Sequence, residues 1–216
     1  MTAAPVRRLE LGPIVPGDDL AVARVLGEAF STDDSLRQQV QLQPAQMRRF
    51  WELQVSLFQV QGPTREKSEV VTARENGRYV AAAVVYEEGW RPDGDVLTAH
   101  LDQYRKAFGL RALARYLRFS AEFSFKSTPS GPCVRLQSLG VADGERGRGL
   151  GATFLEFIHR TAAARGHPVV QLEVRATNPA RTLYERSGYA YADHITVCGV
   201  EMEVMLKILV RGSLST

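Results

Sequence analysis

An Asn-Gly dipeptide at positions 76–77 separates two strand-like segments, SEVVTARE and RYVAAAVVY. Asparagine and glycine both tolerate the positive φ angles that a tight two-residue turn requires, and the flanking segments contain the β-branched and aromatic residues typical of strands. The pattern predicts an antiparallel β-hairpin over residues 68–86. Any fold for this chain must therefore include a pair of antiparallel strands.

Three other segments have apolar residues at helical spacing, and each predicts an amphipathic helix. They are residues 18–30, 44–60 and 96–123. The first has Asp18 or Asp19 as its expected cap, and the second begins at Pro44, a residue suited to a first helical turn. The third is expected to break at Gly109. Its predicted buried face comprises Leu97, Leu101, Tyr104, Phe108, Leu113 and Leu117.

From residue 133 onward the pattern predicts a strand, a glycine-rich loop, a helix, a strand, a short helix and two closing strands. In the first strand, CVRLQSLGV, the apolar pairs Val134/Leu136 and Leu139/Val141 have opposite parity. Side chains alternate between the faces of a strand, so both pairs can face inward only if one residue is inserted between them. The sequence thus predicts a β-bulge at Gln137-Ser138. The next strand, VVQLEVRAT, has an expected inner face of Val170, Leu172, Val174 and Ala176.

The loop ADGERGRGLG connects the bulged strand to a helix expected from about Gly149 to Gly166. A helix N-terminus presents unpaired N–H groups and the positive end of the helix dipole, and glycines let an anion approach them closely. Arg146 and Arg148 add positive charge at the same place. The loop therefore indicates a phosphate-binding site, because a plain strand-to-helix turn would need neither arginine.

Two nucleotide-binding motifs can be compared with this loop. A P-loop is excluded because no Lys-Ser or Lys-Thr pair follows the glycines. Gly147, Gly149 and Ala152 do satisfy the G-x-G-x-x-A spacing of a dinucleotide fingerprint, and Glu173 lies roughly where a ribose-binding acid would stand. The glycines nevertheless follow the strand only after a charged segment, and they lie late in the chain. A dinucleotide-binding oxidoreductase is therefore a distant alternative.

The composition limits the remaining choices. The 216 residues, 44% of them hydrophobic, suffice for one sizeable core without a linker, so a single domain over residues 1–216 is expected. The two cysteines and four histidines lack metal-cluster spacing, so no metal is expected. A formal charge of +3 is too small to predict a nucleic-acid partner. The sequence contains neither an apolar run of membrane-spanning length nor a secretory signal, which favours a cytoplasmic protein with no membrane partner.

Two blocks in the second half resemble the GCN5-related N-acetyltransferase (GNAT) superfamily. RGRGLGA, Arg146–Ala152, fits the R/Q-x-x-G-x-G/A signature of that family. LEVRATNPARTLYERSGYAYAD is similar to its second conserved block, a strand followed by Asn and a short helix ending in Tyr and Gly. The resemblance implies a mixed α/β (α+β) fold whose mostly antiparallel sheet of about seven strands is splayed at strands 4 and 5 and flanked by helices. The helices at about 93–126 would be an insertion in that domain.

The resemblance implies that acetyl-coenzyme A (acetyl-CoA) is the cosubstrate, bound where the bulged fourth strand splays from the fifth. The backbone of the glycine loop would hold the pyrophosphate, and the edge of the fourth strand would pair with the pantetheine arm. The backbone N–H of Val141 would polarise the thioester carbonyl. The residues implied to bind the cofactor are Leu139, Gly140, Val141, Arg146, Gly147, Arg148, Gly149, Leu150, Gly151, Ala152, Asn178 and Tyr184.

Tyr184 and Asn178 each have a structural interpretation beside the functional one. From the sequence alone, Tyr184 is a half-buried aromatic on a short helix, and Asn178 before Pro179 is a cap of that helix. By resemblance, Tyr184 is the general acid that protonates the departing coenzyme A thiolate, and Asn178 also contacts the cofactor arm. The implied reaction is direct attack on the thioester by a primary amine of a small molecule or a peptide.

The sequence identifies neither the general base nor the acceptor. Arg135 and Gln137 occupy the fourth-strand positions where several relatives carry Glu or His. Glu87 and Glu88, at the end of the preceding strand, are alternative candidates, and water is another. Because no base can be assigned, a non-catalytic acyl-CoA-binding or sensor protein is the alternative function. Dimers are common among similar proteins, so a homodimer is one expected assembly.

Overall fold

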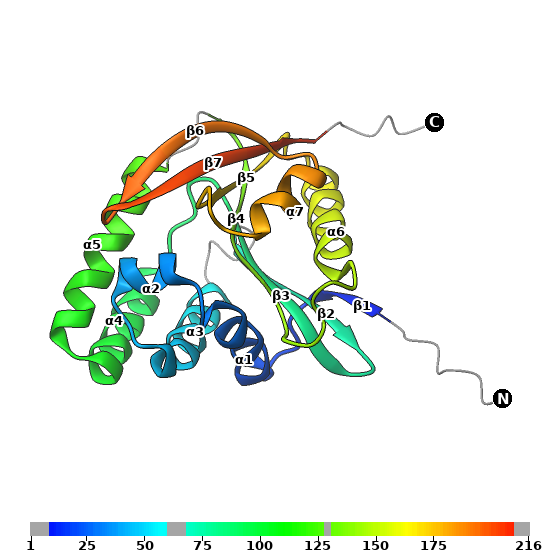
Figure 1. Cartoon of the computed structure of the whole chain (residues 1–216). Helices are drawn as coiled ribbons and strands as arrows, with labels where there is room; N and C mark the ends of the chain where they lie inside the picture. Colours follow the sequence, from blue (N-terminus) through cyan, green and yellow to red (C-terminus); the bar gives the residue numbers. More distant parts are fainter. Residues whose placement is uncertain (1–8, 60–67, 128–130, 210–216) are drawn as a thin grey trace, which may run out of the picture.

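The computed structural model of the chain describes residues 9–59, 68–127 and 131–209. A seven-stranded sheet with the order β1-β2-β3-β4-β5-β7-β6 forms the centre of the molecule, with helices on both faces (Figure 1). The strands are β1 (Leu9–Pro13), β2 (Ser68–Glu75), β3 (Arg78–Glu87), β4 (Val134–Val141), β5 (Val169–Val174), β6 (Ala190–Val197) and β7 (Val200–Ile208). The helices are α1 (Asp19–Phe30), α2 (Asp34–Val40), α3 (Pro44–Gln59), α4 (Gly94–Phe108), α5 (Leu110–Lys126), α6 (Leu150–Ala164) and α7 (Ala180–Arg186).

The sheet is mostly antiparallel, as predicted: among the described strands, only β4 and β5 pair in parallel. The hairpin around the Asn-Gly dipeptide is confirmed, since β2 and β3 pair antiparallel and Asn76 and Gly77 have φ angles of 51° and 78°. A dinucleotide-binding domain is built on a mostly parallel sheet. The strand arrangement therefore argues against the oxidoreductase alternative.

The β-bulge predicted in the fourth strand is confirmed. Ser138 stands opposite Val84 of β3, and Leu136 stands opposite the next residue along β3, so Gln137 is the inserted residue. The insertion keeps Leu136 and Leu139 on one face of the sheet, where both pack in the hydrophobic core beneath α6. The bulge thus preserves the inner face of β4 right up to the glycine loop.

A glycine on the other face of β4 lets α1 approach the sheet closely. A Cβ atom on Gly140 would lie 2.8 Å from the Ala29 Cβ and 3.2 Å from the Leu26 Cδ2. The first distance is too short for a real Cβ contact and the second is unusually tight, so only glycine fits here without a shift. The end of α1 therefore lies directly against the end of β4.

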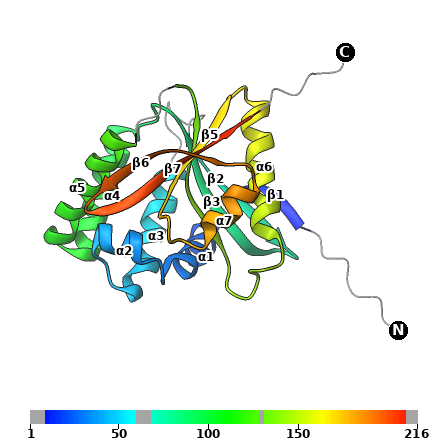
Figure 2. The same ribbon diagram turned by 45° about the horizontal axis from the view of Figure 1, so that its top comes forward.

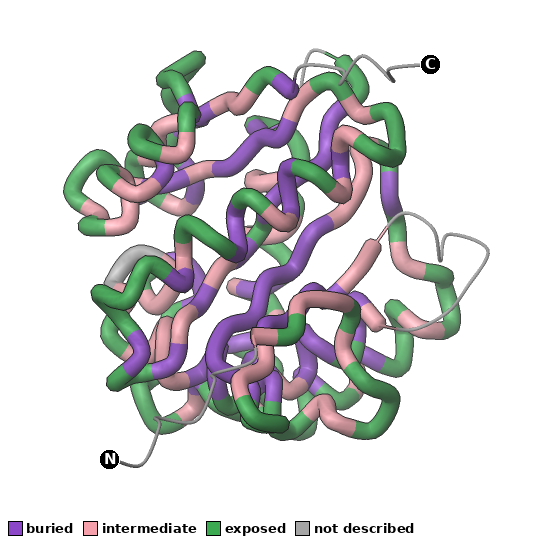
Figure 3. Tube along the Cα trace, turned by 90° about the vertical axis from the view of Figure 1, so that its right-hand side faces the viewer, coloured by how far each residue is buried: buried purple, intermediate pink, exposed green. Residues whose placement is uncertain are grey.

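The helices form two layers (Figures 1 and 2). Helices α6 and α7 pack on one face of the sheet with one hydrophobic core, and α1 to α5 pack on the other with a second core. Figure 3 colours the chain by burial and shows that the buried residues concentrate in the strands at the centre of the molecule, between these layers. None of the described helices is long and apolar enough to cross a membrane.

The helix break predicted at Gly109 is confirmed, since α4 ends one residue before it and α5 begins one residue after it. The predicted buried face is only partly right, because Leu97 and Leu117 are 37% and 44% exposed. Tyr116 is buried instead: its ring joins the aromatic core, and its hydroxyl accepts a hydrogen bond from Gln54 Nε2 at 3.2 Å. On α5, Tyr116 therefore faces the core in place of Leu117.

Two short elements, β1 and α2, are not predicted by the sequence pattern. They have five and seven residues, too few to show a hydrophobic period. β1 is an edge strand beside β2, where its final Pro13 is tolerated. α2 begins after Asp33, whose Oδ1 accepts a hydrogen bond from the Leu36 N–H at 3.0 Å. This cap fixes the loop between α1 and α2.

Two local predictions are only partly right. Asp18 is the N-cap residue of α1, as predicted, but its side chain does not cap the helix: its carboxylate accepts a hydrogen bond from Tyr79 Oη at 2.6 Å, and that of Asp19 accepts one from Gln59 Nε2 at 2.6 Å. The inner face of β5 does not extend to Ala176, which is exposed in the turn after the strand. The helix predicted over residues 44–60 is α3, and residue 60 lies outside the described part of the chain.

Candidate functional site

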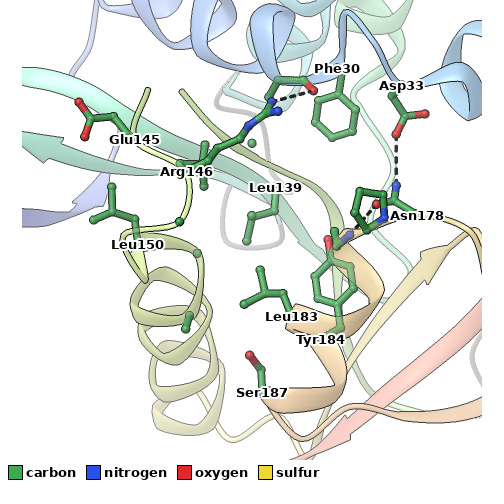
Figure 4. Close-up of a pocket in the computed structure, with 18 of the residues that line it drawn as sticks. Phe30, Asp33, Leu139, Glu145, Arg146, Leu150, Asn178, Leu183, Tyr184 and Ser187 are labelled. Carbon is green, nitrogen blue, oxygen red and sulfur yellow. Dashed lines mark hydrogen bonds between the residues drawn. The ribbon is translucent and has the colours of Figure 1, made fainter. Parts of the chain in front are cut away.

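The two parallel strands stay together for only a short distance. Val134 and Arg135 of β4 pair with Val170 and Gln171 of β5, and beyond them the strands diverge, so the predicted splay is present. The open edge of β4 faces a cavity of about 980 Å³. Figure 4 shows this cavity between the start of α6, helix α7 and the end of α1.

Four segments far apart in the sequence line the cavity. They are the end of α1 with the loop to α2, the end of β4, the glycine loop with the start of α6, and the β5–α7 connection with α7. Every residue predicted to bind the cofactor is part of this lining, except Arg148. The lining includes Leu139, Gly140, Val141, Arg146, Gly147, Gly149, Leu150, Gly151, Ala152, Asn178 and Tyr184.

The glycine loop enters α6 through left-handed backbone. Gly147 and Gly149 have φ angles of 77° and 78°, which residues with a side chain rarely adopt. Helix α6 then begins at Leu150, and no side-chain hydrogen bond caps this end. Its first N–H groups are therefore available to an anion, with the positive end of the helix dipole behind them.

The two arginines of the loop have different surroundings. Arg146 lies at the cavity, 3.2 Å from the Asp143 carboxylate. Arg148 is outside the lining because its guanidinium pairs with Glu75, at 3.1 Å, and with Glu145. These ion pairs tie the glycine loop to the β2–β3 hairpin. The side chain of Arg148 thus holds the shape of the loop, and the prediction that its backbone N–H helps to bind the pyrophosphate stays a prediction.

The backbone of β4 presents hydrogen-bonding groups to the cavity. The Ala142 N–H donates to the Val80 carbonyl of β3 at 2.9 Å. In an antiparallel pair, successive residues direct their N–H groups alternately toward and away from the partner strand. The N–H groups of Val141 and Leu139 therefore face the open edge, and both residues line the cavity. An extended ligand can pair with this edge as an added strand would.

Tyr184 lies on α7 with its ring directed toward the part of the cavity lined by Leu139 and Asn178 (Figure 4). The residue is only 8% exposed. Burial, and less strongly the Asp33 carboxylate, raises the pKa of Tyr184 to about 12. The phenol is therefore neutral at physiological pH and carries a proton that it can donate.

Asn178 connects the start of α7 to the α1–α2 loop. Its Oδ1 accepts a hydrogen bond from the Ala180 N–H at 2.9 Å, so the predicted capping role is confirmed. Its Nδ2 donates to Asp33 Oδ2 at 3.4 Å (Figure 4). Asp33, Phe30 and Arg175 also line the cavity, although the sequence did not predict them. They belong to no motif, and only the tertiary fold brings the α1–α2 loop to the β5–α7 connection.

Neither of the general-base side chains considered from the sequence, Glu87 and Glu88, lines the cavity, and neither do Arg135 and Gln137 at the fourth-strand positions. Gln137 is exposed in the bulge, and Glu87 and Glu88 are half-buried elsewhere. Arg135 is buried, and its guanidinium lies 2.8 Å from the carboxylate of Glu173. Glu173 is therefore an ion-pair partner inside the fold, away from the glycine loop. Among the described residues, no three His, Cys, Asp or Glu side chains gather into a group that could hold a metal ion.

Comparisons with known proteins agree with this geometry. The model of the Acetyltransferase (GNAT) family matches residues 34–189, well over half of the chain. A search of curated proteins finds no match. A solved structure from Corynebacterium glutamicum, described as histone acetyltransferase HPA2 and related acetyltransferase, matches with a TM-score of 0.61 at 22% identity, covering 95% of this chain and 99% of that chain.

Two further solved structures have a similar fold. Arylalkylamine N-acetyltransferase 2 from Aedes aegypti matches with a TM-score of 0.60 at 18% identity, covering 94% of this chain and all of that one. The yncA protein from Salmonella typhimurium, solved with its cofactor acetyl-CoA, matches with a TM-score of 0.54 at 15% identity, covering 96% and 98% of the two chains. At identities below 25%, these structures show a shared fold, whereas the family relationship rests on the match to the family model.

Proposed function

Because the chain belongs to the GNAT family of acetyltransferases, we propose that it transfers an acetyl group from acetyl-CoA to a primary amine of a small molecule or a peptide. The observation that carries this proposal is the cavity at the β4–β5 splay, where the open strand edge, the glycine loop and Tyr184 meet. The presence of acetyl-CoA in the similar yncA structure supports the choice of cosubstrate. The arylalkylamine specificity of the Aedes protein supports an amine acceptor.

In the proposed complex, the pyrophosphate of acetyl-CoA binds the N–H groups at the start of α6, around Gly149 and Gly151. Arg146, at the same part of the cavity, adds positive charge. The pantetheine arm then pairs with the N–H groups of Leu139 and Val141 along the open edge of β4. This path leads from the glycine loop toward Tyr184 on α7.

The proposed reaction begins with attack of the neutral amine nitrogen on the thioester carbonyl carbon. The carbonyl oxygen gains negative charge and accepts a hydrogen bond from the Val141 N–H. When the C–S bond breaks, its electron pair stays on sulfur, and Tyr184 donates its proton to the thiolate. The nitrogen loses its surplus proton as the amide forms, and Tyr184 regains a proton through solvent.

A thermal-shift titration with acetyl-CoA, coenzyme A and NAD tests the cofactor assignment. Ligand binding to the folded state alone stabilises a protein by about 2.7 kcal/mol at a hundred times the Kd, so the first two ligands are expected to raise the Tm by several degrees. NAD is expected to leave the Tm unchanged. No response to acetyl-CoA would overturn the proposal. A response without acetylation of any primary amine would favour the sensor alternative.

The Ala152→Asp variant tests where the pyrophosphate binds. Ala152 is exposed, lines the cavity and lies in the first turn of α6. An aspartate there repels the pyrophosphate, so acetyl-CoA affinity is expected to fall about tenfold or more in calorimetric titration. The Tm without ligand is expected to stay level or rise, since an acid in the first turn suits the helix dipole.

Thr153→Asp is the matched control for that variant. Thr153 is exposed in the same turn but does not line the cavity. It brings the same charge to the same helix end, so a loss of affinity at position 152 clearly larger than at position 153 is expected. Equal affinities in both variants and the wild type would show that the pyrophosphate lies elsewhere.

A further inference from the structure

The cavity contains charges of both signs, and only some of them are balanced by neighbours. Its described acidic residues are Asp33 and Glu145, and its arginines are Arg146, Arg175 and Arg186. Glu145 forms ion pairs with two arginines of the hairpin and the glycine loop. Arg146 lies 3.2 Å from an aspartate of its own loop. Asp33, Arg175 and Arg186 form no ion pair with any residue that the structure describes.

Asp33 lies at the same part of the cavity as the proposed general acid. Its carboxylate accepts hydrogen bonds from the Leu36 N–H at 3.0 Å and from Asn178 Nδ2 at 3.4 Å. Both donors are neutral, so the negative charge of Asp33 has no counter-charge among the residues that the structure describes. The charge also reaches Tyr184, since it contributes to the raised pKa of the phenol. A protonated amine beside Tyr184 would form a charge-assisted hydrogen bond with this carboxylate.

Arg175 lies in the connection between β5 and α7, directly after the last residue of β5, and it lines the cavity. The same connection contains Asn178, whose Nδ2 donates to Asp33 Oδ2 at 3.4 Å. The start of α6, where the pyrophosphate is proposed to bind, belongs to a different segment of the lining. Arg175 is therefore assigned to the acceptor rather than to the cofactor phosphates.

We infer that the acceptor is a primary amine that also carries a carboxylate or a similar anionic group, with its ammonium at Asp33 and its anion at Arg175. The inference rests on the proposed function and narrows its substrate class. A simple monoamine would leave Arg175 without a partner in a partly enclosed site. A diamine would bring a second cation toward an arginine and would be repelled. A zwitterion satisfies both charges.

A panel of primary amines tests this inference. The panel contains α-amino acids and unbranched ω-amino acids of two to six carbons, the amide of each, and the diamines of the same lengths. The acids are expected to be acetylated with kcat/KM values roughly ten- to a hundredfold above those of their amides, because a charged hydrogen-bonded pair is lost in the amides. Diamines are expected to be poorer still. Equal or better turnover of amides or diamines overturns the inference.

Two variants test which residue binds each charged group of the acceptor. Arg175→Gln is expected to remove the preference for acids over amides by raising KM for the acids alone. Asp33→Asn is expected to raise KM for every amine in the panel. Asparagine is also a good helix cap, so Asp33→Asn removes the charge and can keep the hydrogen bond to the Leu36 N–H. Arg160→Gln, at an exposed position, and Asp102→Asn, at a partly exposed one, are the controls, since both residues lie outside the cavity.

The acetyl-CoA thermal shift separates failure of the inference from failure of the proposed function. Both variants are expected to keep the wild-type shift, because neither side chain is assigned to the cofactor. If Arg175→Gln weakens acetyl-CoA binding and leaves the acid preference intact, the arginine binds cofactor phosphate and the inference is wrong. If the wild-type protein binds acetyl-CoA but acetylates none of the acids, the inference is wrong while the cofactor assignment stands.

Discussion

Replacing Tyr184 with phenylalanine is expected to lower kcat for amine acetylation by about a hundredfold. The phenylalanine ring keeps the packing of α7 but has no proton to give, so the coenzyme A sulfur must leave as a bare thiolate. The loss is limited because a thiol of pKa about 8.5 is already a fair leaving group. Acetyl-CoA affinity is expected to change little, because in the proposed complex the pyrophosphate and the pantetheine arm bind to backbone groups elsewhere. Steady-state kinetics and calorimetric titration measure the two quantities.

Tyr191→Phe is the matched control. It removes the same atom from a tyrosine that is 55% exposed on β6 and does not line the cavity, so wild-type kcat is expected. Full activity in Tyr184→Phe would mean that water or another group protonates the thiolate. A joint loss of kcat and acetyl-CoA affinity would instead point to a distorted site.

The pH dependence of the wild-type enzyme provides an independent check on Tyr184. Its pKa is raised to about 12, so the protonated form that the proposed mechanism requires persists well above neutral pH. The value of kcat is therefore expected to rise with pH as the bound amine loses its proton, with no decline below about pH 11. A decline centred near pH 10 would indicate a phenol with the ordinary pKa.

The features of the site that could be predicted from the sequence depend on neighbours in the chain. The β-bulge follows from the parity of the apolar residues of β4, and the uncapped start of α6 follows from the glycines placed directly before it. Asn178 caps α7, a role that its position before Pro179 already indicates. In each case the physical cause acts over a few residues, so a local pattern is enough to reveal it.

The features that could not be predicted depend on residues far apart in the chain. Arg148 looks like a phosphate ligand from its place in the motif, yet it pairs with Glu75, which the hairpin brings beside it. Asp33 reaches the cavity because Gly140 allows α1 to lie close to β4. No periodicity or motif contains information about such contacts, because they exist only after the sheet has formed.

Replacing Glu173 with alanine is expected to destabilise the protein by roughly 3–5 kcal/mol, seen as a lower urea midpoint in unfolding experiments. The side chains of Arg135 and Glu173 are 5% and 3% exposed and lie 2.8 Å apart. The Arg135 guanidinium carbon also lies 5.1 Å and 5.6 Å from the ring centres of Phe123 and Tyr86. Without Glu173, this buried cation has no counter-charge among the described residues and keeps only the neutral Ser127 hydroxyl as a hydrogen-bond partner there.

Two comparisons show whether burial of the charge is the cause. Arg135→Met combined with Glu173→Leu is expected to recover most of the lost stability, because a buried apolar pair has no charge to desolvate. Glu28→Ala, which breaks the exposed ion pair with Arg24, is expected to cost less than about 1 kcal/mol. If Glu173→Ala has an effect as small as Glu28→Ala, the buried cation has found another partner or water.

The Glu173 variant also bears on how the acceptor loses its proton. By the family resemblance, Arg135 stands at a fourth-strand position where several relatives carry Glu or His, and in this chain its charge is balanced inside the fold by Glu173. Neither residue lines the cavity, so neither is expected to take a proton from a bound amine. Glu173→Ala is therefore expected to lower stability while leaving kcat per folded molecule unchanged, the opposite of Tyr184→Phe. A loss of kcat in fully folded Glu173→Ala would show instead that the ion pair between Arg135 and Glu173 shapes the active site, so that strand β5 contributes to catalysis.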